Sequence, residues 1–429
     1  MTRSDPAVAV VGSFDTKGVE HAFLRDAIED AGVRTVTVDF GIIGDPAFAP
    51  DVAAAEVALS AGTSLERLRA RRNEPGARSE AINAMATGMG RLLAELHRRG
   101  DFDGVVGLGG GQGSTVISAG MRALPVGVPK LLVSTMAPMN IGLYFGHTDL
   151  TLMHAVTDIA GLNAVSRSIL GNAARGIAGM ARRPAVEGSA STRPLIGLTM
   201  FGTTTPGVTA AQEQLDSAGF DSIVFHAVGS GGAAMEDLIR AGTIDGVIDY
   251  TPSEVTDELL GGIFTAGPDR MTVAAERGLP QVLIPGALCQ LTLGALDTVP
   301  PRFLAAGRPY VVHNPSVTVV RVDAADAATV GSVFAEKAAT APADVEVVLP
   351  LGGLSEYEQP GAPLGDPESD AALFDAIREH LPSRIPLHER DEDINDAAFA
   401  RFVVDRFLAL WAASGRALPT SKPIKEERP

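Results

Sequence analysis

Short apolar runs alternate with segments of helical periodicity along most of this chain, and this rhythm restricts the fold more than any other feature. Strands are predicted at 7–12, 34–39, 103–108 and 129–133, with helices at 18–31 and 78–99. Strands and helices that alternate in this way build parallel sheets covered by helices. We therefore expect an α/β protein with mainly parallel, Rossmann-like sheets flanked by helices.

The length of 429 residues exceeds what one ordinary core holds, so we expect two lobes. Residues 181–194 are small, polar or helix-breaking and lack periodicity, which is typical of a linker. We assign 1–183 to an N-terminal Rossmann-like nucleotide-binding lobe, 184–194 to the linker and 195–429 to a C-terminal Rossmann-like lobe. Strands of the second lobe are predicted at 195–200, 221–226, 244–249, 281–284, 310–312 and 345–349.

Composition disfavours several classes of partner. The formal charge of −17 argues against a nucleic-acid or anionic-membrane partner, because both require basic surfaces. No uninterrupted apolar stretch reaches the roughly 18 residues of a membrane-spanning helix. The single cysteine, Cys289, cannot form an intramolecular disulfide, and no signal peptide is visible. We therefore expect a cytoplasmic protein.

A glycine-rich loop follows the predicted strand at 103–108 and leads into a helix. Glycine lets a backbone approach a ligand closely, and the amides at a helix N-terminus attract anions. We predict that this loop binds a small anionic molecule, such as a phosphate or carboxylate. Its predicted contacts are Gly109, Gly110, Gly111, Gly113, Ser114 and Thr115, with the hydroxyls of Ser134 and Thr135 from the end of the next strand.

The turn after the first strand holds three further candidates, Asp15, Thr16 and Lys17. Asp15 or Thr16 either caps the next helix, as any strand–turn–helix requires, or takes part in ligand binding. In the second case Lys17 meets a phosphate and Asp15 orients a metal or a water. Asp39 ends the second strand, where dinucleotide-binding folds place the acid that holds a ribose, although a turn-forming aspartate is common there.

The second half repeats the theme of strand, polar loop and helix. Three hydroxyls before Pro206 indicate an anion site, with Thr204 and Thr205 as its contacts. His226 ends a strand and is the best general acid/base candidate, because its unperturbed pKa lies nearest neutrality. A lone histidine at a strand end is nevertheless more often structural. We further predict substrate contacts from Gly231, Gly232 and Arg270, although Arg270 is equally suited to a salt bridge.

Metal and thiol chemistry have weak support in the sequence. There is no His-Glu-x-x-His motif and no cysteine pair, so no metal ligands are predicted. Magnesium held by a carboxylate and ligand phosphates leaves no motif and stays open. Cys289 follows a predicted buried strand, which favours an inert thiol over a nucleophile.

Five motifs in matching order resemble the Tm-one-like ATP-binding domain family, over nearly the whole chain. They are Gly12-Ser13-Phe14-Asp15-Thr16-Lys17-Gly18, the segment 121–130, Phe201-Gly202-Thr203-Thr204-Thr205-Pro206-Gly207, His313-Asn314-Pro315 and Asp393-Ile394-Asn395-Asp396. This family includes the inhibitory domain of a plant tobamovirus-resistance protein and bacterial stand-alone proteins. The resemblance implies two Rossmann-like subdomains, ATP as the ligand with or without Mg²⁺, and a homodimer.

This chain departs from the family pattern at one place. Where we expect an acid, a methionine and an asparagine after Gly-Ala-Leu, it has Cys289, Gln290 and Thr292. If the expected acid and amide are catalytic in relatives, this protein has altered its substrate choice or lost that reaction.

Three functional hypotheses follow. The leading one is an ATP-binding protein that activates a small carboxylate or sugar acid in a cleft between its lobes, with His226 as acid/base. The second is a nucleotide-free isomerase or lyase that acts on a phosphorylated sugar or sugar acid, whose phosphate the same loops would hold. The third is a regulatory binding module whose nucleotide occupancy controls a protein partner.

Overall fold

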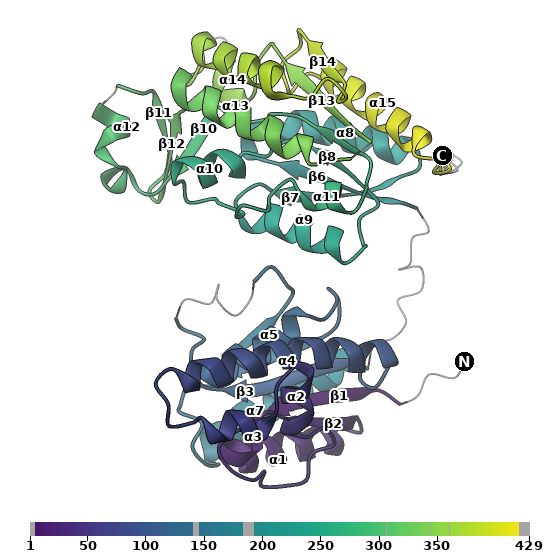
Figure 1. Cartoon of the computed structure of the whole chain (residues 1–429), viewed down its shortest axis with the longest axis vertical. Coiled ribbons are helices and arrows are strands. Elements are labelled where there is room, and N and C mark those ends of the chain that lie inside the picture. The colour runs from purple at the N-terminus through teal and green to yellow at the C-terminus, as the bar shows by residue number, and fades with distance from the viewer. Residues whose placement is uncertain are drawn as a thin grey trace, which may run out of the picture. The chain divides into compact units, whose positions relative to one another are not determined.

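The computed structural model describes residues 5–139, 146–182, 193–305, 307–342, 344–359 and 361–419. The chain divides into two compact units, residues 1–187 and 188–429, which we call lobe 1 and lobe 2 (Figure 1). Of the predicted linker, only Arg193 and Pro194 lie within the described residues. Within those ranges, no helix combines the length and apolarity needed to cross a membrane.

Lobe 1 contains a five-stranded parallel sheet, in the order β2-β1-β3-β4-β5. Its strands are β1 (Ala7–Gly12), β2 (Arg34–Asp39), β3 (Gly104–Gly109), β4 (Lys130–Ser134) and β5 (Thr151–His154). The four strands predicted from apolar runs are confirmed. The partly exposed edge strand β5 was not predicted.

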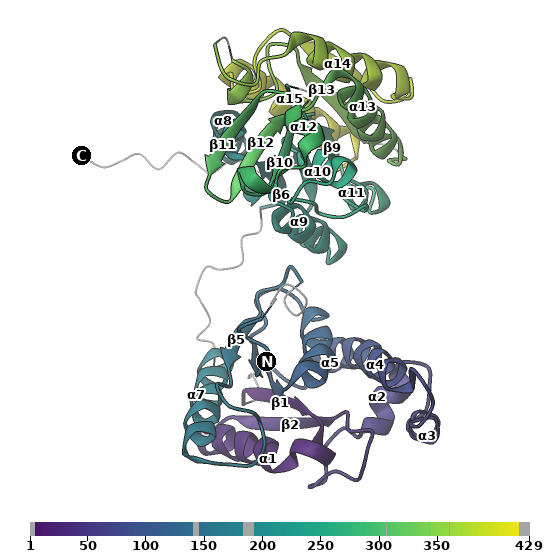
Figure 2. The same ribbon diagram turned by 90° about the vertical axis from the view of Figure 1, so that its left-hand side faces the viewer.

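Helices cover both faces of this sheet (Figure 2). One face carries α1 (Phe14–Asp30) and α7 (Ala164–Ala181); the other carries α2 (Ala54–Ser60), α3 (Leu65–Ala70), α4 (Ala77–Arg99) and α5 (Gly111–Arg122). Val8 and Val10 of β1 pack beneath α1 and α7, whereas Ala9 and Val11 pack beneath α4 and α5. This alternation explains why the strand is apolar at every position.

Lobe 2 is built on a six-stranded parallel sheet in the order β14-β13-β9-β8-β6-β7. The strands are β6 (Leu195–Met200), β7 (Asp221–His226), β8 (Gly246–Asp249), β9 (Gln281–Leu283), β13 (Val345–Pro350) and β14 (Leu387–Arg390). One face packs on α8 (Thr205–Ser217) and α15 (Ala397–Ala413). The other packs on α9 (Ser230–Arg240), α10 (Glu254–Leu260), α11 (Val273–Glu276), α13 (Ala324–Ala339) and α14 (Pro367–His380). The predicted fold class is therefore confirmed in both lobes.

A small antiparallel sheet departs from the predicted rhythm. It consists of β10 (Gln290–Leu293), β12 (Val317–Arg321) and β11 (Tyr310–Asn314), with α12 (Pro301–Ala305) before β11 (Figure 1). The predicted strand 310–312 exists, but it pairs antiparallel with β12 and does not join the parallel sheet. The hairpin turns at Pro315 and Ser316, where proline cannot donate a ladder hydrogen bond.

Candidate functional site

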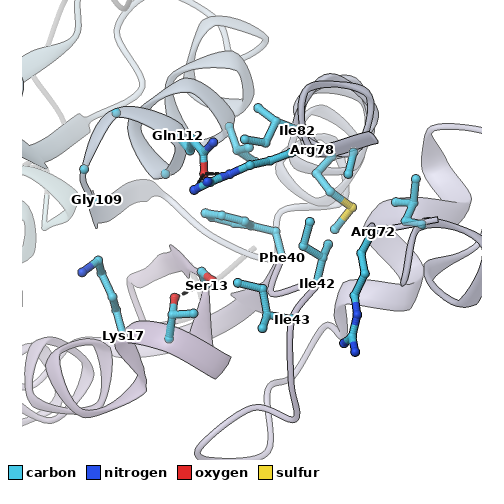
Figure 3. A pocket seen from close by; sticks show the side chains of 18 of the residues that line it. Ser13, Lys17, Phe40, Ile42, Ile43, Arg72, Arg78, Ile82, Gly109 and Gln112 are labelled. Atoms are coloured by element: carbon cyan, nitrogen blue, oxygen red, sulfur yellow. Dashed lines mark hydrogen bonds between the residues drawn. The ribbon is translucent and has the colours of Figure 1, made fainter. Parts of the chain in front are cut away.

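Lobe 1 contains a cavity of about 700 Å³ at the carboxyl ends of β1, β2 and β3 (Figure 3). Such edges of doubly wound sheets are the usual place for ligands. Much of its wall is apolar and comes from Phe40, Ile42, Ile43, Leu68, Ala77, Ala81, Ile82, Met85, Leu108 and Val116. The remainder is polar or glycine and comes from Ser13, Thr16, Lys17, Arg72, Asn73, Arg78, Gln112, Gly109, Gly110, Gly111 and Gly113. The cavity thus joins an apolar surface to a polar edge.

The polar edge includes the glycine loop between β3 and α5. An added Cβ at Gly109 would lie 2.9 Å from the amide nitrogen of Ser114, so this glycine is needed for close packing. At Gly110 and Gly111 the nearest atoms would be 3.7 and 3.9 Å away, an ordinary contact distance, so a Cβ would fit there. Among the described residues, the amides of Gly110, Gly111, Gln112 and Gly113 donate no hydrogen bond to the protein. They are free donors at the positive end of a twelve-residue helix.

Two basic side chains extend toward this loop. The ammonium group of Lys17 donates to the carbonyl oxygen of Ile159, and Arg78 donates from Nε and Nη2 to Oε1 of Gln112, at 3.1 and 2.7 Å. In Figure 3, Lys17 points toward Gly109 and Arg78 reaches over Phe40 to Gln112, whereas the side chain of Arg72 extends away. None of the described residues that line the cavity is acidic. A chain of charge −17 therefore carries a locally cationic cavity edge.

Asp15 has a different place from the one predicted. It is not among the cavity-lining residues, whereas Thr16 and Lys17 are. Its carboxylate accepts hydrogen bonds from the Ser13 hydroxyl at 2.6 Å and from the amides of Ile43 and Gly44 at 2.7 and 3.0 Å. Asp15 therefore holds the loop after β2 against α1, and this loop forms part of the cavity wall.

Asp39 does not face the cavity as a ribose-binding acid would. It is 3% exposed, and its Oδ1 accepts from the amides of Phe14 and Gly41 at 2.8 and 2.9 Å. Burial raises the pKa of this carboxyl, against the two amide hydrogen bonds that lower it. Asp39 therefore shapes the turn between β1 and α1, and its predicted contact with a ribose stays a prediction.

Of the predicted hydroxyl contacts of lobe 1, those of Ser114, Ser134 and Thr115 have structural partners. Ser114 and Ser134 are fully buried and hydrogen-bond to each other at 2.7 Å, which joins α5 to β4. Thr115 donates to the carbonyl of Gly111 in its own helix. Thr135 follows β4, and its amide donates to the carbonyl of Gly109. Of the predicted cofactor contacts, the cavity retains Thr16, Lys17, Gly109, Gly110, Gly111 and Gly113.

Sequence reasoning missed the apolar wall and Arg78. Ile82 and Met85 lie on α4 at helical spacing, which predicts a core face and gives no sign of a ligand. Phe40 follows β2 directly, so its position at a strand end was the one available signal. Arg78 and Gln112 are 34 residues apart, and only the fold brings them together.

Lobe 2 has a glycine turn of its own, Gly229–Gly232, between β7 and α9. Here the amides of Gly229 and Gly232 donate to Oε1 of Glu254 at 3.0 and 2.9 Å. Glu254 is fully buried and receives Nε of Arg270 on its other oxygen at 2.6 Å. The predicted substrate contact of Gly232 is thus made by a carboxylate of the protein itself. An added Cβ at Gly231 would collide with the carbonyl of His226, so that glycine is required sterically.

Arg270 is bound to three carboxylates of the protein, which corrects its predicted role as a clamp for substrate. It is 1% exposed and pairs with Asp249 through Nη1 and Nη2 at 2.5 and 2.7 Å. Glu254 lies 2.6 Å from its Nε and Glu236 3.5 Å from its Nη1. Burial raises the pKa of both glutamates, opposed by the charge of Arg270. A buried arginine needs such partners, so this cluster ties α9 and α10 to the end of β8.

The other predicted residues of lobe 2 have local partners as well. Thr204 is buried and bonds to the hydroxyl of Thr251 at 2.8 Å, while Thr205 donates to the carbonyls of Phe201 and Gly202. His226 is exposed, its Nδ1 lies 3.1 Å from the carbonyl of Met200, and its ring stacks on Phe201. Its role as an acid/base stays a prediction.

Comparison with known proteins identifies the family. Residues 6–185 match the N-terminal domain, and residues 193–411 the C-terminal domain, of an uncharacterised protein family, UPF0261. A UPF0261 protein of Clostridium tetani is 39% identical over 394 residues, covering 92% of this chain and 96% of the relative. This chain belongs to the UPF0261 family. A UPF0261 protein of Rhizobium meliloti is 41% identical over 403 residues, covering 92% of this chain and 98% of that protein.

A tomato protein is also similar to this chain. The ToMV susceptible protein tm-1(GCR26) of Solanum lycopersicum is 36% identical over 350 residues, which cover 80% of this chain and 46% of the tomato protein. This confirms the resemblance seen in the motifs. Among solved structures, the glycosyltransferase SsfS6 of Streptomyces sp. SF2575 matches at 14% identity and a TM-score of 0.20, covering 97% of each chain. So low a score carries no argument about function.

The structure explains why the family motifs have their glycines. In lobe 1, a Cβ at Gly12 would collide with the His21 ring, and one at Gly18 with Ala47. In lobe 2, the motif around Asn395 meets the threonine motif: the Asn395 amide group donates to the carbonyl of Thr203 at 3.0 Å and accepts from Gly207 at 3.3 Å. These segments therefore build the turns at the strand ends.

The departures from the expected pattern lie in the interior of lobe 2. Cys289 is 3% exposed, and burial raises the pKa of its thiol well above the usual value, as expected for an inert cysteine. Gln290 donates to the hydroxyl of Ser355 at 2.6 Å. The backbone of Thr292 donates to Asp257 at 2.8 Å. Among the described residues, no cluster of His, Cys, Asp or Glu is suited to hold a metal ion.

Proposed function

We propose that lobe 1 of this UPF0261 protein binds an adenine nucleotide. The observation that carries the proposal is that free amides at the start of α5 and a broad apolar wall line one cavity. Free amides at a helix N-terminus are suited to phosphate, and an apolar wall with an aromatic ring is suited to a base. The volume of about 700 Å³ falls within the range of small-molecule sites.

The apolar wall favours a nucleotide over a phosphorylated sugar. Phe40, Ile82 and Met85 offer carbon surface and no hydrogen-bond partners for a ring of hydroxyl groups. Any sugar hydroxyl that lay against that surface would be buried without a partner, at a cost of about 1–3 kcal/mol for each unpaired group. A purine buries apolar area there, which stabilises the complex.

The lining also favours binding without turnover. Phosphoryl transfer and hydrolysis use a base or a water-positioning residue beside the phosphates. Among the described residues that line the cavity there is no aspartate, glutamate or histidine. Lobe 1 therefore fits the regulatory binding module better than the ATP-dependent activation of an acid, which stays a prediction for experiment.

Calorimetric titration with ATP tests the proposal. Gly110→Val places a side chain at the start of α5, where a Cβ has its nearest neighbour at 3.7 Å, at a backbone conformation (φ −81°, ψ −163°) that valine adopts readily. We expect this variant to fold and to lose ATP binding. The matched control is Gly202→Val, in the threonine loop of lobe 2, where an added Cβ has no neighbour within 4 Å. ATP affinity that is equal in Gly110→Val and wild type would refute the proposal.

Two further measurements separate the functional hypotheses. Incubation with ATP, alone and with a panel of sugar acids, is expected to release no ADP, AMP or phosphate; release would favour the enzymatic hypothesis. In a thermal-shift series, ATP and ADP are expected to stabilise the protein more than sugar phosphates do. The reverse order would favour the isomerase or lyase.

A further inference from the structure

We propose that the nucleotide occupies this cavity as a metal-free polyphosphate, with Lys17 and Arg78 in the place of a divalent cation. The inference rests on the proposed function and specifies the chemical form of its ligand. Family resemblance allows Mg²⁺ as a companion of ATP, so the oxygen donors around the cavity decide whether that ion fits.

The oxygen donors do not suit Mg²⁺. In nucleotide sites this ion is held by one or two carboxylates in addition to phosphate oxygens and water. The described lining residues supply no carboxylate. Asp15, the nearest candidate by sequence, directs one oxygen to the amides of Ile43 and Gly44 and receives the Ser13 hydroxyl on the other.

Three of the neutral side-chain oxygens of the lining, those of Ser13, Thr16 and Gln112, already take part in hydrogen bonds. The hydroxyls of Ser13 and Thr16 lie 2.9 Å apart and bond to each other, and Ser13 is at the same time the donor to Asp15. Oε1 of Gln112 accepts two hydrogen bonds from Arg78. A cation placed at Gln112 would lie beside a guanidinium group, and like charges at such distances repel strongly.

Lys17 and Arg78 can supply the positive charge that a metal usually supplies. An ammonium group has three N–H donors and a guanidinium group five, and the contacts in lobe 1 use one and two of them. Both side chains reach toward the glycine loop from different helices, α1 and α4 (Figure 3). Charge-assisted hydrogen bonds from such groups to phosphate are short and strong.

The test is calorimetric titration of the full chain with ATP, in EDTA and in excess Mg²⁺ at matched ionic strength. We expect the affinity in EDTA to equal or exceed that in Mg²⁺, because the bound form has to shed the ion. Weaker binding in EDTA would overturn the inference and leave the proposed function intact. Absence of binding in both buffers would instead refute the proposed function.

Charge variants test the two residues separately. In EDTA, Arg78→Gln and Lys17→Met are each expected to weaken ATP binding about tenfold, the loss of one charge-assisted hydrogen bond. Lys17→Arg should restore most of the affinity. Arg98→Gln is the matched control, since Arg98 is exposed on the same helix as Arg78 and does not line the cavity. Wild-type affinity in both Arg78→Gln and Lys17→Met would overturn the assignment.

Discussion

Both lobes contain a glycine turn between a parallel strand and a helix, but the two turns differ in whether their backbone amides have hydrogen-bond partners. In lobe 1 the amides of Gly110 and Gly111 have no partner among the described residues, and the turn lines a cavity. In lobe 2 the amides of Gly229 and Gly232 are occupied by the buried carboxylate of Glu254. One turn is open to an anion from outside, and the other already holds an anion of the protein.

This difference shows that a glycine turn predicts an affinity for anions and leaves the identity of the anion undetermined. Backbone amides at a helix start attract negative charge whatever its source. In lobe 2 the charge comes from Glu254, and Arg270 balances it. In lobe 1 the basic groups Lys17 and Arg78 line the cavity, and no described lining residue supplies a carboxylate. The charges beside each turn therefore distinguish a ligand site from a structural joint.

The largest expected effect is in lobe 2. Arg270→Met leaves three carboxylates, Asp249, Glu254 and Glu236, buried without their cation. We expect the free energy of unfolding of lobe 2 to fall by about 3–5 kcal/mol. Urea unfolding followed by the fluorescence of Trp411, the single tryptophan of the chain and a residue of α15, measures it.

The matched control is Arg240→Met. Arg240 is a surface arginine of α9 that pairs with Asp237 at 2.9 Å and has a side chain 46% exposed. Its loss should change the stability by at most about 0.5 kcal/mol. An equal, small loss in both variants would mean that the buried cluster does not need its arginine, and the contrast between the lobes would lose its electrostatic basis.

Alanine in place of one glycine of each turn gives the next largest effect. A Cβ at Gly232 would collide with the Glu254 carboxylate and lie 2.6 Å from Nε of Arg270, whereas one at Gly110 has its nearest neighbour at 3.7 Å. We expect Gly232→Ala to destabilise lobe 2 by about 2 kcal/mol, as overpacked buried sites do. Gly110→Ala should leave lobe 1 unchanged within about 0.5 kcal/mol.

Trp411 fluorescence during urea unfolding measures the stability of Gly232→Ala, and hydrogen exchange of the β3–α5 peptides measures that of Gly110→Ala. Tolerance of alanine at both positions would show that lobe 2 can move Glu254 aside and open its turn to a ligand.

Most strands of the parallel sheets could be predicted from the sequence because they are buried on both faces, whereas the partly exposed edge strands β5 and β14 were not predicted. Val8 and Val10 face one core and Ala9 and Val11 the other, so the whole strand is a local apolar run. The short antiparallel strand β10 has the pattern Gln-Leu-Thr-Leu, and its partner β12 lies about thirty positions along the chain. Its pairing depends on tertiary contacts that no local window contains.

The glycine loop of lobe 1 was found for the same reason, since four glycines among five residues are a local signal. The carboxylate that binds the lobe 2 turn could not be predicted in this way. Glu254 follows Gly232 by 22 residues, and its place in the sequence is typical of any residue at a helix start. Arg270 shows the same limit: its suitability for a phosphate or carboxylate could be read from its chemistry, but the three carboxylates that bind it come from α9, β8 and α10.

A pH dependence of opposite sign is expected in the two lobes. Burial lowers the pKa of His21 in lobe 1 to about 4, below its ordinary 6.5. Because the unfolded chain then binds the proton more readily, lobe 1 should lose stability as pH falls from 6.5 to 4. Burial raises the pKa of Asp257 in lobe 2 to about 7, above its ordinary 3.8, so Asp257 should make lobe 2 lose stability as pH rises from 4 to 7. Each group contributes at most about 1.4 kcal/mol per pH unit.

Measurements at pH 5 and pH 7 check the direction of the stability change in each lobe. Urea unfolding followed by Trp411 fluorescence measures lobe 2, and hydrogen exchange of α1 and α7 measures lobe 1. His21→Gln should flatten the response of lobe 1 and leave that of lobe 2 unaltered. If lobe 2 lost no stability between pH 5 and pH 7, the carboxyl of Asp257 would already be ionised in the folded state at pH 5, contrary to its raised pKa.

The smallest expected effect concerns His226, the acid/base candidate of the sequence. His226 is exposed and contacts the ring of Phe201, with centroids 5.6 Å apart, and the carbonyl of Met200. Removal of this stacking in His226→Ala should cost lobe 2 about 0.5–1.5 kcal/mol, and His226→Phe should recover most of it. ATP affinity should be unchanged in both variants, because His226 does not line the cavity of lobe 1.

A calorimetric titration in which His226→Ala weakened ATP binding while Gly202→Val did not would assign this histidine a part in ligand binding. The open turn of lobe 1 would then be insufficient by itself, and the division of roles between the lobes would fail.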